Sequence, residues 1–326
     1  MVRLTTSAPN GSISSVLPEN YSVTVRPILV TGVAGFIGSH VARRLAADGA
    51  KIVGVDDLSM GHRTNIPAEI DFVEGDLSES STYDKLPSQV DYVLHLAGQS
   101  SGEISFDDPV ADLEKNTVST LRMVDYATRA SATKLVYASS MSVYGDVPDS
   151  AIAEGHVPRP LSCYGVGKLA AEQYLKIFAK KMPSLSFRMF NVYGPGQDMT
   201  NLRQGMISIY VAQALANNHI VVKGSFDRFR DFVFIDDVVD AWQLASRATL
   251  QGAQVVNLGT GVRTTVRHVL DMIVEAIPGV TVEQTDPTPG DQTGIYCDNT
   301  RLAEVLGKKT FVPLGDGLKR FVSFLR

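Results

Sequence analysis

A glycine-rich segment constrains the fold of this chain more than any other feature of the sequence. Residues 31–38 (TGVAGFIG) directly follow the apolar run 28–30 and open an amphipathic stretch that extends to residue 47. Glycines here let the backbone turn tightly and approach a pyrophosphate, whose charge a helix N-terminus stabilises. A glycine-rich turn without a ligand is the alternative interpretation. We predict a dinucleotide site whose contacts include Gly32, Gly35, Phe36, Ile37 and Gly38.

Short apolar runs alternate with helical patterns through the first half of the chain. The apolar runs cover residues 28–30, 52–55, 71–73, 92–94 and 135–137. Helical patterns follow the first, fourth and fifth of these runs, at residues 37–47, 110–130 and 165–180. Near-continuous apolar runs are typical of strands that are buried on both faces of a parallel sheet. The alternation predicts an α/β fold with a doubly wound parallel sheet of the Rossmann type.

The pattern changes after Asn191 and divides the chain into parts. Residues 193–198 predict a loop, and helical patterns at 207–217, 236–248 and 266–277 lie beyond it. We expect an NAD-type dinucleotide domain over residues 26–190 and a smaller C-terminal α/β substrate-binding domain over residues 191–326. Some segments of the latter, at about 230–262, are expected to pack back on the first domain. Residues 1–25, rich in Ser, Pro and Asn, are expected to form a loose extension.

Composition and charge exclude several classes of partner. The chain has 326 residues, 44% of them hydrophobic, and a net charge of -5, with no long basic run that favours nucleic acid. No window is apolar enough for a membrane span. The two cysteines, Cys163 and Cys297, fit neither a zinc motif nor a disulfide framework, which favours a reduced compartment. We expect a soluble cytoplasmic protein without a metal site.

Acidic residues follow the second and third predicted strands. Asp56 and Asp57 end the second strand, where a carboxylate can accept hydrogen bonds from both ribose hydroxyls. Two adjacent carboxylates repel a 2′-phosphate and so favour NAD over NADP, although Arg63 lies close enough in sequence to leave NADP open. Asp76 is expected to bind the adenine amino group, with an ordinary turn aspartate as the alternative. His95, in an apolar run, is assigned no role. Further residues expected at the cofactor are Leu77, Leu96 and Ala97.

Tyr164 and Lys168 lie four residues apart and share one face of a predicted helix. A tyrosine loses its proton near pH ~10. The neighbouring ammonium and a positively charged nicotinamide both favour the phenolate, so we expect the pKa of Tyr164 to be lowered toward neutrality. The pair then acts as a general base that takes a proton from an alcohol as hydride leaves its carbon. Two surface residues of an ordinary helix are the alternative.

Serines end the fifth predicted strand, in residues 138–145 (ASSMSVYG). A hydroxyl at the carboxyl end of a strand points into the crevice where open α/β sheets bind ligands. Either Ser140 or Ser142 is therefore placed to hydrogen-bond the reacting oxygen beside Tyr164. A serine-rich turn without a catalytic role is the alternative, above all for Ser142.

Three motifs together identify a family resemblance. The segment 31–38, the set Ser140, Tyr164 and Lys168, and residues 190–195 (FNVYGP) resemble the extended short-chain dehydrogenase/reductases from Pro27 to the C-terminus. Within that group the chain is most similar to the nucleotide-sugar 4-epimerases. The resemblance implies that Ser140, Tyr164 and Lys168 are catalytic, that NAD is the cofactor and that a UDP-sugar is the substrate. It also implies a homodimer formed through the helices at 110–130 and 165–180.

The resemblance implies binding residues as well. Asn116 matches an asparagine that lines the family's active site, and Asn191 matches one that contacts the phosphate region of the substrate. The stretch that contains Asn201 and Met206 resembles the segment that covers the nucleotide. Arg230 matches the family's diphosphate-binding arginine, whose guanidinium can hold phosphate oxygens bidentately. Arg228, which points the same way if the segment is extended, is expected to assist it.

The chain departs from the family pattern at two positions. Thr288 stands where many members have a second arginine, ahead of the expected substrate-binding residue Asp291. We expect Arg228 or Arg263 to replace the missing phosphate contact. Ile295 stands where some epimerases have a bulky tyrosine, and a smaller side chain there favours room for an N-acetyl group.

The two residues after Ser140 distinguish between related enzymes whose reactions begin in the same way. The related 4,6-dehydratases carry an Asp-Glu pair where this chain has Met141 and Ser142, and the decarboxylating relatives carry a glutamate at the second position. The epimerase/reductases usually have a cysteine where Met141 stands. A thioether and a hydroxyl cannot drive elimination by acid/base chemistry. We therefore predict a 4-epimerase acting through a transient 4-keto sugar. A 4-ketoreductase with net NAD(P)H turnover is one alternative, and a non-catalytic dinucleotide-binding regulator is another.

Overall fold

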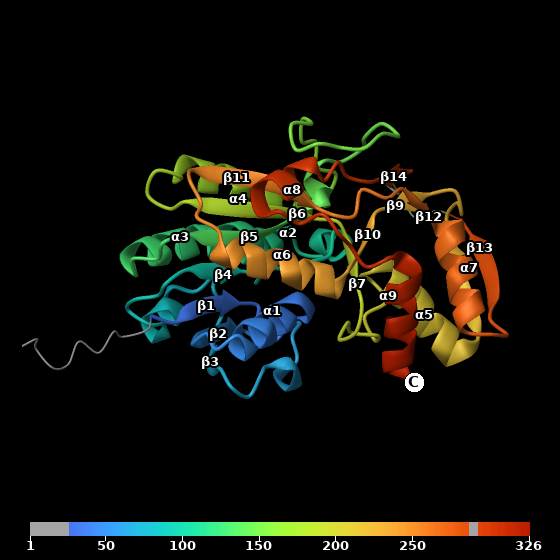
Figure 1. The fold of residues 1–326 in the computed structure, drawn as a ribbon, viewed down its shortest axis with the longest axis horizontal. Helices are drawn as coiled ribbons and strands as arrows, with labels where there is room; N and C mark the ends of the chain where they lie inside the picture. Colours follow the sequence, from blue (N-terminus) through green and yellow to red (C-terminus); the bar gives the residue numbers. More distant parts are fainter. Residues whose placement is uncertain (1–25, 287–292) are drawn as a thin grey trace, which may run out of the picture.

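The computed structural model describes residues 26–286 and 293–326, and a seven-stranded sheet forms its centre (Figure 1). The strand order is β11-β6-β5-β4-β1-β2-β3, and every neighbouring pair is parallel. The strands are β1 (Ile28–Thr31), β2 (Ile52–Asp56), β3 (Asp71–Glu74), β4 (Val93–His95), β5 (Leu135–Ser140), β6 (Ser184–Met189) and β11 (Ala253–Leu258). The order reverses between β1 and β4, where doubly wound sheets bind their ligands. The predicted fold class is confirmed.

Helices cover both faces of this sheet. They are α1 (Phe36–Ala47) and α6 (Ile235–Arg247) on one face, and α3 (Ser119–Arg129) and α4 (Cys163–Ile177) on the other. Val30 and Leu94 pack into the core that contains α1 and α6, whereas Leu29 and Val93 pack into the core that contains α3 and α4. Because alternate residues of β1 enter different cores, this strand is apolar at nearly every position.

The helix predicted over residues 110–130 is interrupted. It consists of α2 (Pro109–Leu113), a π-helical turn (Glu114–Val118) and α3. The hydroxyl of Thr120 donates to the carbonyl oxygen of Asn116 at 2.7 Å and so gives that group a partner within the wide turn. π-Helical turns occur frequently at functional sites. Lys115 of this turn lines the cavity described in the next section.

The second half of the chain forms a smaller assembly of short strands and helices, at the right of Figure 1. Its strands are β7 (Asn191–Tyr193), β8 (His219–Lys223), β9 (Phe229–Arg230), β10 (Phe232–Phe234), β12 (Thr264–Thr265), β13 (Thr281–Thr285) and β14 (Gly294–Ile295). Its helices are α5 (Met206–Asn217), α7 (Val266–Ala276) and α9 (Leu314–Leu325). In contrast, α6, β11 and α8 (Thr300–Leu306) leave this half and join the layers of the large sheet.

Most predicted helices lie where the sequence places them. The bounds of α5, α6 and α7 differ by one residue at most from the predicted ranges 207–217, 236–248 and 266–277. The expected extension over residues 1–25, Thr288 and Asp291 lie outside the described residues. Within the described ranges, no helix combines the length and the apolar character needed to cross a membrane.

Candidate active site

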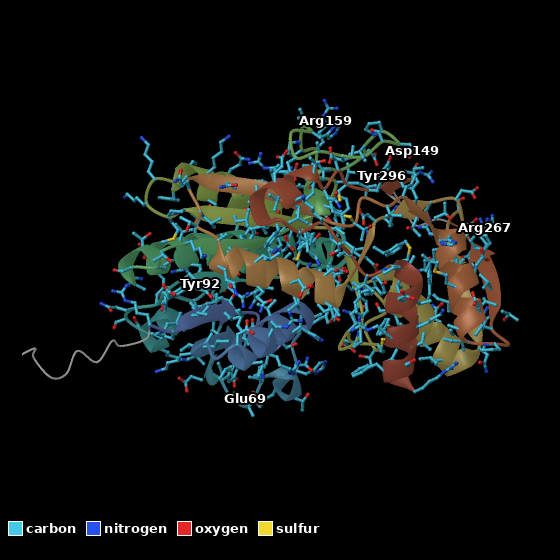
Figure 2. All side chains as sticks on the ribbon, in the orientation of Figure 1. Glu69, Tyr92, Asp149, Arg159, Arg267 and Tyr296 are labelled. Atoms are coloured by element: carbon cyan, nitrogen blue, oxygen red, sulfur yellow. The ribbon has the colours of Figure 1, made fainter. Side chains whose placement is uncertain are left out.

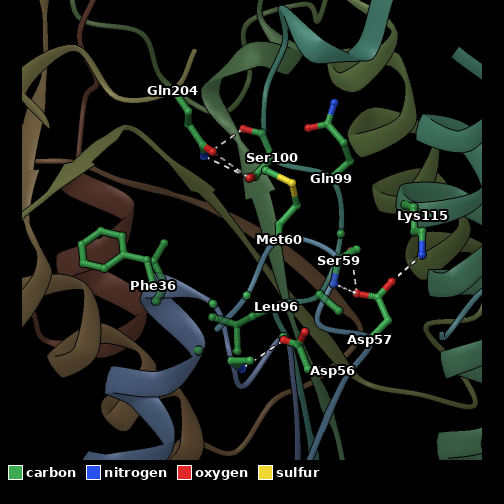
Figure 3. Close-up of a pocket in the computed structure, with 18 of the residues that line it drawn as sticks. Phe36, Asp56, Asp57, Ser59, Met60, Leu96, Gln99, Ser100, Lys115 and Gln204 are labelled. Carbon is green, nitrogen blue, oxygen red and sulfur yellow. Dashed lines mark hydrogen bonds and ion pairs between the residues drawn. The ribbon is translucent and has the colours of Figure 1, made fainter. Parts of the chain in front are cut away.

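A large cavity of about 740 Å³ lies beside the glycine-rich turn, at the carboxyl ends of the central strands (Figure 3). We call it the large cavity. Its walls come from the loops after β1, β2, β3 and β4 and from helix α4. The predicted cofactor residues that line it are Gly32, Gly35, Phe36, Ile37, Gly38, Asp56, Asp57, Asp76, Leu77, Leu96, Ala97, Tyr164 and Lys168.

Two glycines of the turn leave no room for a side chain. Gly32 has a φ of 68°, and a Cβ there would lie 2.8 Å from the backbone nitrogen of Ala97. A Cβ on Gly38 would lie 2.0 Å from the carbonyl oxygen of Gly32. Since backbone atoms occupy these positions, no other residue lets the turn, β4 and α1 pack so closely. The resulting cradle fits a pyrophosphate at the N-terminus of α1.

Asp56 is held at the end of β2 by two backbone amides. One carboxylate oxygen accepts from the N–H of Ala34 at 3.0 Å and the other from the N–H of Leu58 at 2.8 Å. Burial raises the pKa of Asp56, although the two amides act in the opposite direction. Each oxygen of a carboxylate has a further lone pair. The fixed carboxylate can therefore still accept hydrogen bonds from ribose hydroxyls.

Sequence reasoning missed Lys115, which joins the two other carboxylates of this end of the cavity. Its ammonium donates to Asp57 (Figure 3) and, at 2.7 Å, to Asp76. Burial opposes ionisation of both carboxylates, but the hydrogen bonds outweigh it and lower the pKa of Asp57 and of Asp76. The partners lie 58 and 39 residues from Lys115 in sequence, so no local pattern reveals the contact.

Arg63, whose position in the sequence kept NADP as an alternative cofactor, forms its contacts outside the large cavity. Its guanidinium forms an ion pair with Glu74 and lies 5.3 Å from the centre of the Phe72 ring. Arg63 is absent from the described residues that line the large cavity, whereas Asp56 and Asp57 are present there. This arrangement favours NAD over NADP at the adenosine ribose.

Tyr164 and Lys168 are both buried on the first two turns of α4. The ammonium of Lys168 lies 5.6 Å from the centre of the Tyr164 ring and 5.1 Å from the centre of the Tyr137 ring. Both residues line the large cavity. The predicted pair therefore shares one face of the helix, and that face is directed at the cavity.

The protein's own residues do not lower the pKa of Tyr164, so the predicted lowering by a bound nicotinamide stays a prediction. Burial raises the pKa of Tyr164 to about 12, a hydrogen bond with Ser140 lowers it, and the charge of Asp112 raises it. Burial also lowers the pKa of Lys168 to about 8, against the effect of Asp112. The desolvation of a buried phenolate therefore exceeds the help from the hydrogen bond with Ser140. Further positive charge, such as that of an oxidised nicotinamide, is needed to favour the phenolate near neutral pH.

A second cavity of about 310 Å³ adjoins the first, and we call it the small cavity. Tyr164 lines both cavities and so stands where they meet. The hydroxyl of Ser140 accepts from the N–H of Ser142 at 3.1 Å, and the two hydroxyls lie 3.2 Å apart. The predicted substrate residues that line the small cavity are Ser140, Ser142, Asn191 and Met206.

Two predicted asparagines lie at the large cavity or just behind it. Asn201 lines the large cavity. Asn116 is buried on the π-helical turn, and its amide donates to Asp112 at 3.0 Å. A Cβ on Gly98, which lines the cavity, would lie 2.5 Å from the side-chain oxygen of Asn116. Asn116 therefore stands behind the wall that Gly98 forms.

The structure does not bring the predicted arginines to either cavity. Arg228 donates to the backbone carbonyls of Ser225 and Lys223, within its own turn. Arg230 is buried and donates to the carbonyl of Phe229 at 2.8 Å. Arg263 pairs with Asp149 at 2.9 Å, at the end of the molecule where Figure 2 labels Asp149 and Tyr296. Arg228, Arg230 and Arg263 are all missing from the described linings of both cavities.

A latch, formed by Arg203 and Gln204, connects the loop before α5 to the loop after β4. The amide of Gln204 donates to the carbonyl of Ser100 at 3.2 Å (Figure 3). Arg203 pairs with Glu103 at 2.9 Å and with Asp107 at 2.7 Å. Gln204 and Ser100 line both cavities, so the latch lies where the large and the small cavity meet.

A dinucleotide cradle that opens into a second cavity at a buried tyrosine is the arrangement of an enzyme that moves hydride between a bound cofactor and an alcohol. Residues 28–259 match the NAD dependent epimerase/dehydratase family. This match covers most of the chain, which therefore belongs to that family. The protein is an NAD-dependent enzyme, as the cofactor and class predictions stated.

Several relatives resemble the chain over nearly their whole length. The UDP-glucose 4-epimerase of Mycolicibacterium smegmatis is 37% identical over 308 residues, which are 91% of this chain and 98% of that protein. The UDP-glucose 4-epimerase of Thermotoga maritima, solved with UDP-glucose, superposes with a TM-score of 0.88 at 32% identity and covers 92% of this chain and 98% of its own. The UDP-N-acetylglucosamine 4-epimerase of Methanobrevibacter ruminantium, solved with UDP-N-acetylmuramic acid, gives 0.85 at 26% identity, with the same coverage of both chains.

Proposed function

We propose that this protein is an NAD-dependent nucleotide-sugar 4-epimerase that acts on a UDP-hexose, a UDP-N-acetylhexosamine or a UDP-hexuronate. The observation that carries the proposal is the position of Tyr164 at the junction of the two cavities. The names of the relatives from Mycolicibacterium smegmatis, Thermotoga maritima and Methanobrevibacter ruminantium support it. Residues 26–190 then hold NAD, and residues 191–326 bind most of the nucleotide sugar.

The groups of the site have separate tasks in this reaction. NAD, when bound, supplies an acceptor for the hydride of sugar C4 and a donor for its return. Tyr164 removes the proton of the C4 hydroxyl, and the hydroxyl of Ser140 donates to the resulting carbonyl oxygen. The ammonium of Lys168 stabilises the phenolate. The 4-keto sugar then turns within the small cavity, so that hydride returns to the opposite face of C4 while Tyr164 returns the proton to the C4 oxygen.

The chemistry of the small cavity favours epimerisation over elimination. Met141 and Ser142 line it at the positions where dehydratases need carboxylates. The one carboxylate among the described residues of its wall is Glu103, and Arg203 holds that group at 2.9 Å. No lining group in the described part of the chain is therefore placed as an acid/base pair for loss of water.

The purified protein is expected to convert a UDP-sugar into its C4 epimer without added cofactor. The test is incubation with UDP-glucose, UDP-N-acetylglucosamine and UDP-glucuronate, each followed by NMR. The substrate that reacts also identifies the sugar class. A product that forms only when NADH or NADPH is added and consumed indicates a 4-ketoreductase, and no reaction across the panel contradicts an enzyme of nucleotide sugars.

We also propose that the enzyme is a homodimer. Apolar side chains on α2 and α4, which pack against each other, are exposed in the single chain: Val110, Leu113, Val166, Tyr174 and Ile177. Ile177→Asp is expected to turn a dimer into a monomer in size-exclusion chromatography with light scattering, because a charge would be buried in the interface. Val262→Asp, which alters an exposed valine elsewhere, is the matched control. A monomeric wild type contradicts the proposal.

The cytoplasmic location stays a prediction from the two free cysteines, Cys163 and Cys297.

A further inference from the structure

Asp112 is a buried carboxylate at the edge of the large cavity to which neither the sequence nor the proposed reaction assigns a role. It lies in α2 with 2% of its surface exposed, and it lines the cavity together with Tyr164 and Lys168. A Cβ on Gly167, the residue before Lys168, would lie 3.5 Å from its Oδ2 atom. The carboxylate is therefore packed directly against the part of α4 that carries the reacting pair.

Only half of this carboxylate has a hydrogen-bond partner among the described residues. Oδ1 accepts from the amide of Asn116 at 3.0 Å, whereas Oδ2 is fully buried without a partner. The side-chain oxygen of Asn116 is buried and unpartnered in the same way. A buried carboxylate oxygen without a partner costs free energy, so its retention calls for a role.

Lys168 supplies the complementary charge. A Cβ on Gly98 would lie 2.5 Å from the side-chain oxygen of Asn116 and 3.2 Å from the ammonium of Lys168, so both atoms border the same glycine. The structure shows Lys168 against two aromatic rings and gives it no hydrogen bond with a described residue. Lys168 is buried, with 3% of its surface exposed, and it lines the cavity.

The charged and titratable groups that face Lys168 come from four elements. From β4, His95 is buried between two threonine hydroxyls, and burial lowers its pKa to about 3, so it is neutral. From β5 and α4, Tyr137 and Tyr164 are phenols whose pKa values burial raises. From α2 comes Asp112, which among the described residues is the one carboxylate whose charge acts on Lys168. The ammonium therefore has a single counter-ion within the described part of the protein.

We propose that Asp112 is a positioning residue that acts through Lys168: its charge keeps the ammonium protonated and so sets the pH range in which Tyr164 and Lys168 work together. Asn116 fixes one oxygen of the carboxylate and leaves the other directed toward α4. An anion that borders the same cavity favours a protonated lysine and disfavours a phenolate. The inference rests on the proposed role of Tyr164 and Lys168 in hydride-transfer chemistry.

The sign of the effect follows from these charges. Without the anion, Lys168 loses its proton at a lower pH, and Tyr164 ionises at a lower pH as well. Activity needs an ionised Tyr164 on the acid side of the profile and a protonated Lys168 on the alkaline side. Both limbs of the profile of kcat against pH therefore move toward lower pH when Asp112 loses its charge.

The variant Asp112→Asn tests this, because it keeps the shape of the side chain and removes the charge. We expect both limbs of the profile to move by about one pH unit. Glu114→Gln is the matched control, since it makes the same charge change at an exposed residue nearby and should leave the profile in place. Should Asp112→Asn fail to fold, Asp112→Ala carries the same prediction. An unmoved profile in a folded variant overturns the proposal even if kcat falls, and so does failure of both variants to fold.

A second measurement separates this proposal from the proposed function. The ionisation of Lys168 can be followed by NMR of isotope-labelled lysine in protein without substrate, with Lys168→Arg to identify the signal. We expect the signal to titrate at a lower pH in Asp112→Asn than in the wild type. If that shift occurs in a protein that epimerises no UDP-sugar, the proposed function fails and the role of Asp112 stands. If the protein epimerises a UDP-sugar but the Lys168 signal does not shift in Asp112→Asn, the proposed function stands and the role of Asp112 is contradicted.

Discussion

Replacing Tyr164 by phenylalanine is expected to lower kcat about 10³-fold, because a positioned general acid or base contributes roughly that factor. The ring stays in place, so only the hydroxyl at the junction of the two cavities is lost. NAD should remain bound, since the cradle at Gly32 and Gly38 is untouched. The measurement is kcat for the reactive UDP-sugar, together with the NAD content of the purified variant.

A second tyrosine on the same helix provides the control. Tyr174→Phe removes a hydroxyl from α4 at a position that lines neither cavity within the described residues. Its kcat should equal that of the wild type. If Tyr164→Phe keeps more than a tenth of the wild-type kcat while NAD is bound, another group takes the proton and the proposed mechanism is wrong.

Replacing Glu172 by glutamine is expected to lower the free energy of unfolding by about 3–5 kcal/mol, the usual loss when one partner of a buried ion pair is removed. Glu172 on α4 accepts from Arg188 on β6 at 2.7 and 3.0 Å and from the hydroxyl of Ser139 on β5. Both charged side chains are almost fully buried. The variant leaves the guanidinium of Arg188 charged, because the loss of its partner does not bring the pKa of an arginine near neutrality. Urea unfolding measures the change.

Two further variants decide how this result is interpreted. Asp125→Asn breaks the exposed pair of Asp125 with Arg129 and should alter stability little. The double variant Glu172→Leu/Arg188→Met removes both charges and should recover much of the loss, because apolar side chains can replace a buried pair. A loss below about 1 kcal/mol in Glu172→Gln would show that water reaches Arg188.

The sequence predicted much of the fold because its signals are local. The glycine turn, the apolar runs and the helical periods each need only a few neighbouring residues to be recognised. The strand β6 escaped prediction for a related reason. Ser184, Ser186 and Arg188 alternate along it and suggest a solvent-exposed face, yet all three are buried. The partner that permits the burial of Arg188, Glu172, lies on a different element.

The residues of the candidate site likewise fall into two groups: those that a local pattern predicts and those that only the folded chain brings together. Tyr164 and Lys168 were predictable because four residues of helix place two side chains on one face. Lys115 and Asp112 were not, since each acts on groups that only the folded chain brings near it. The phosphate contacts of Arg228, Arg230 and Arg263 stay predictions, because these arginines are absent from the linings of both cavities among the described residues.

The sequence by itself determined the parallel sheet, the dinucleotide turn and the spacing of the tyrosine and the lysine, because these depend on backbone geometry and on short-range periodicity. Only the tertiary structure decided the electrostatics of the site. The pKa of Tyr164 depends on how deeply surrounding elements bury it, and the charge of Lys168 depends on a carboxylate from another helix. Burial and long-range pairing are properties of the whole fold, so no local pattern contains them.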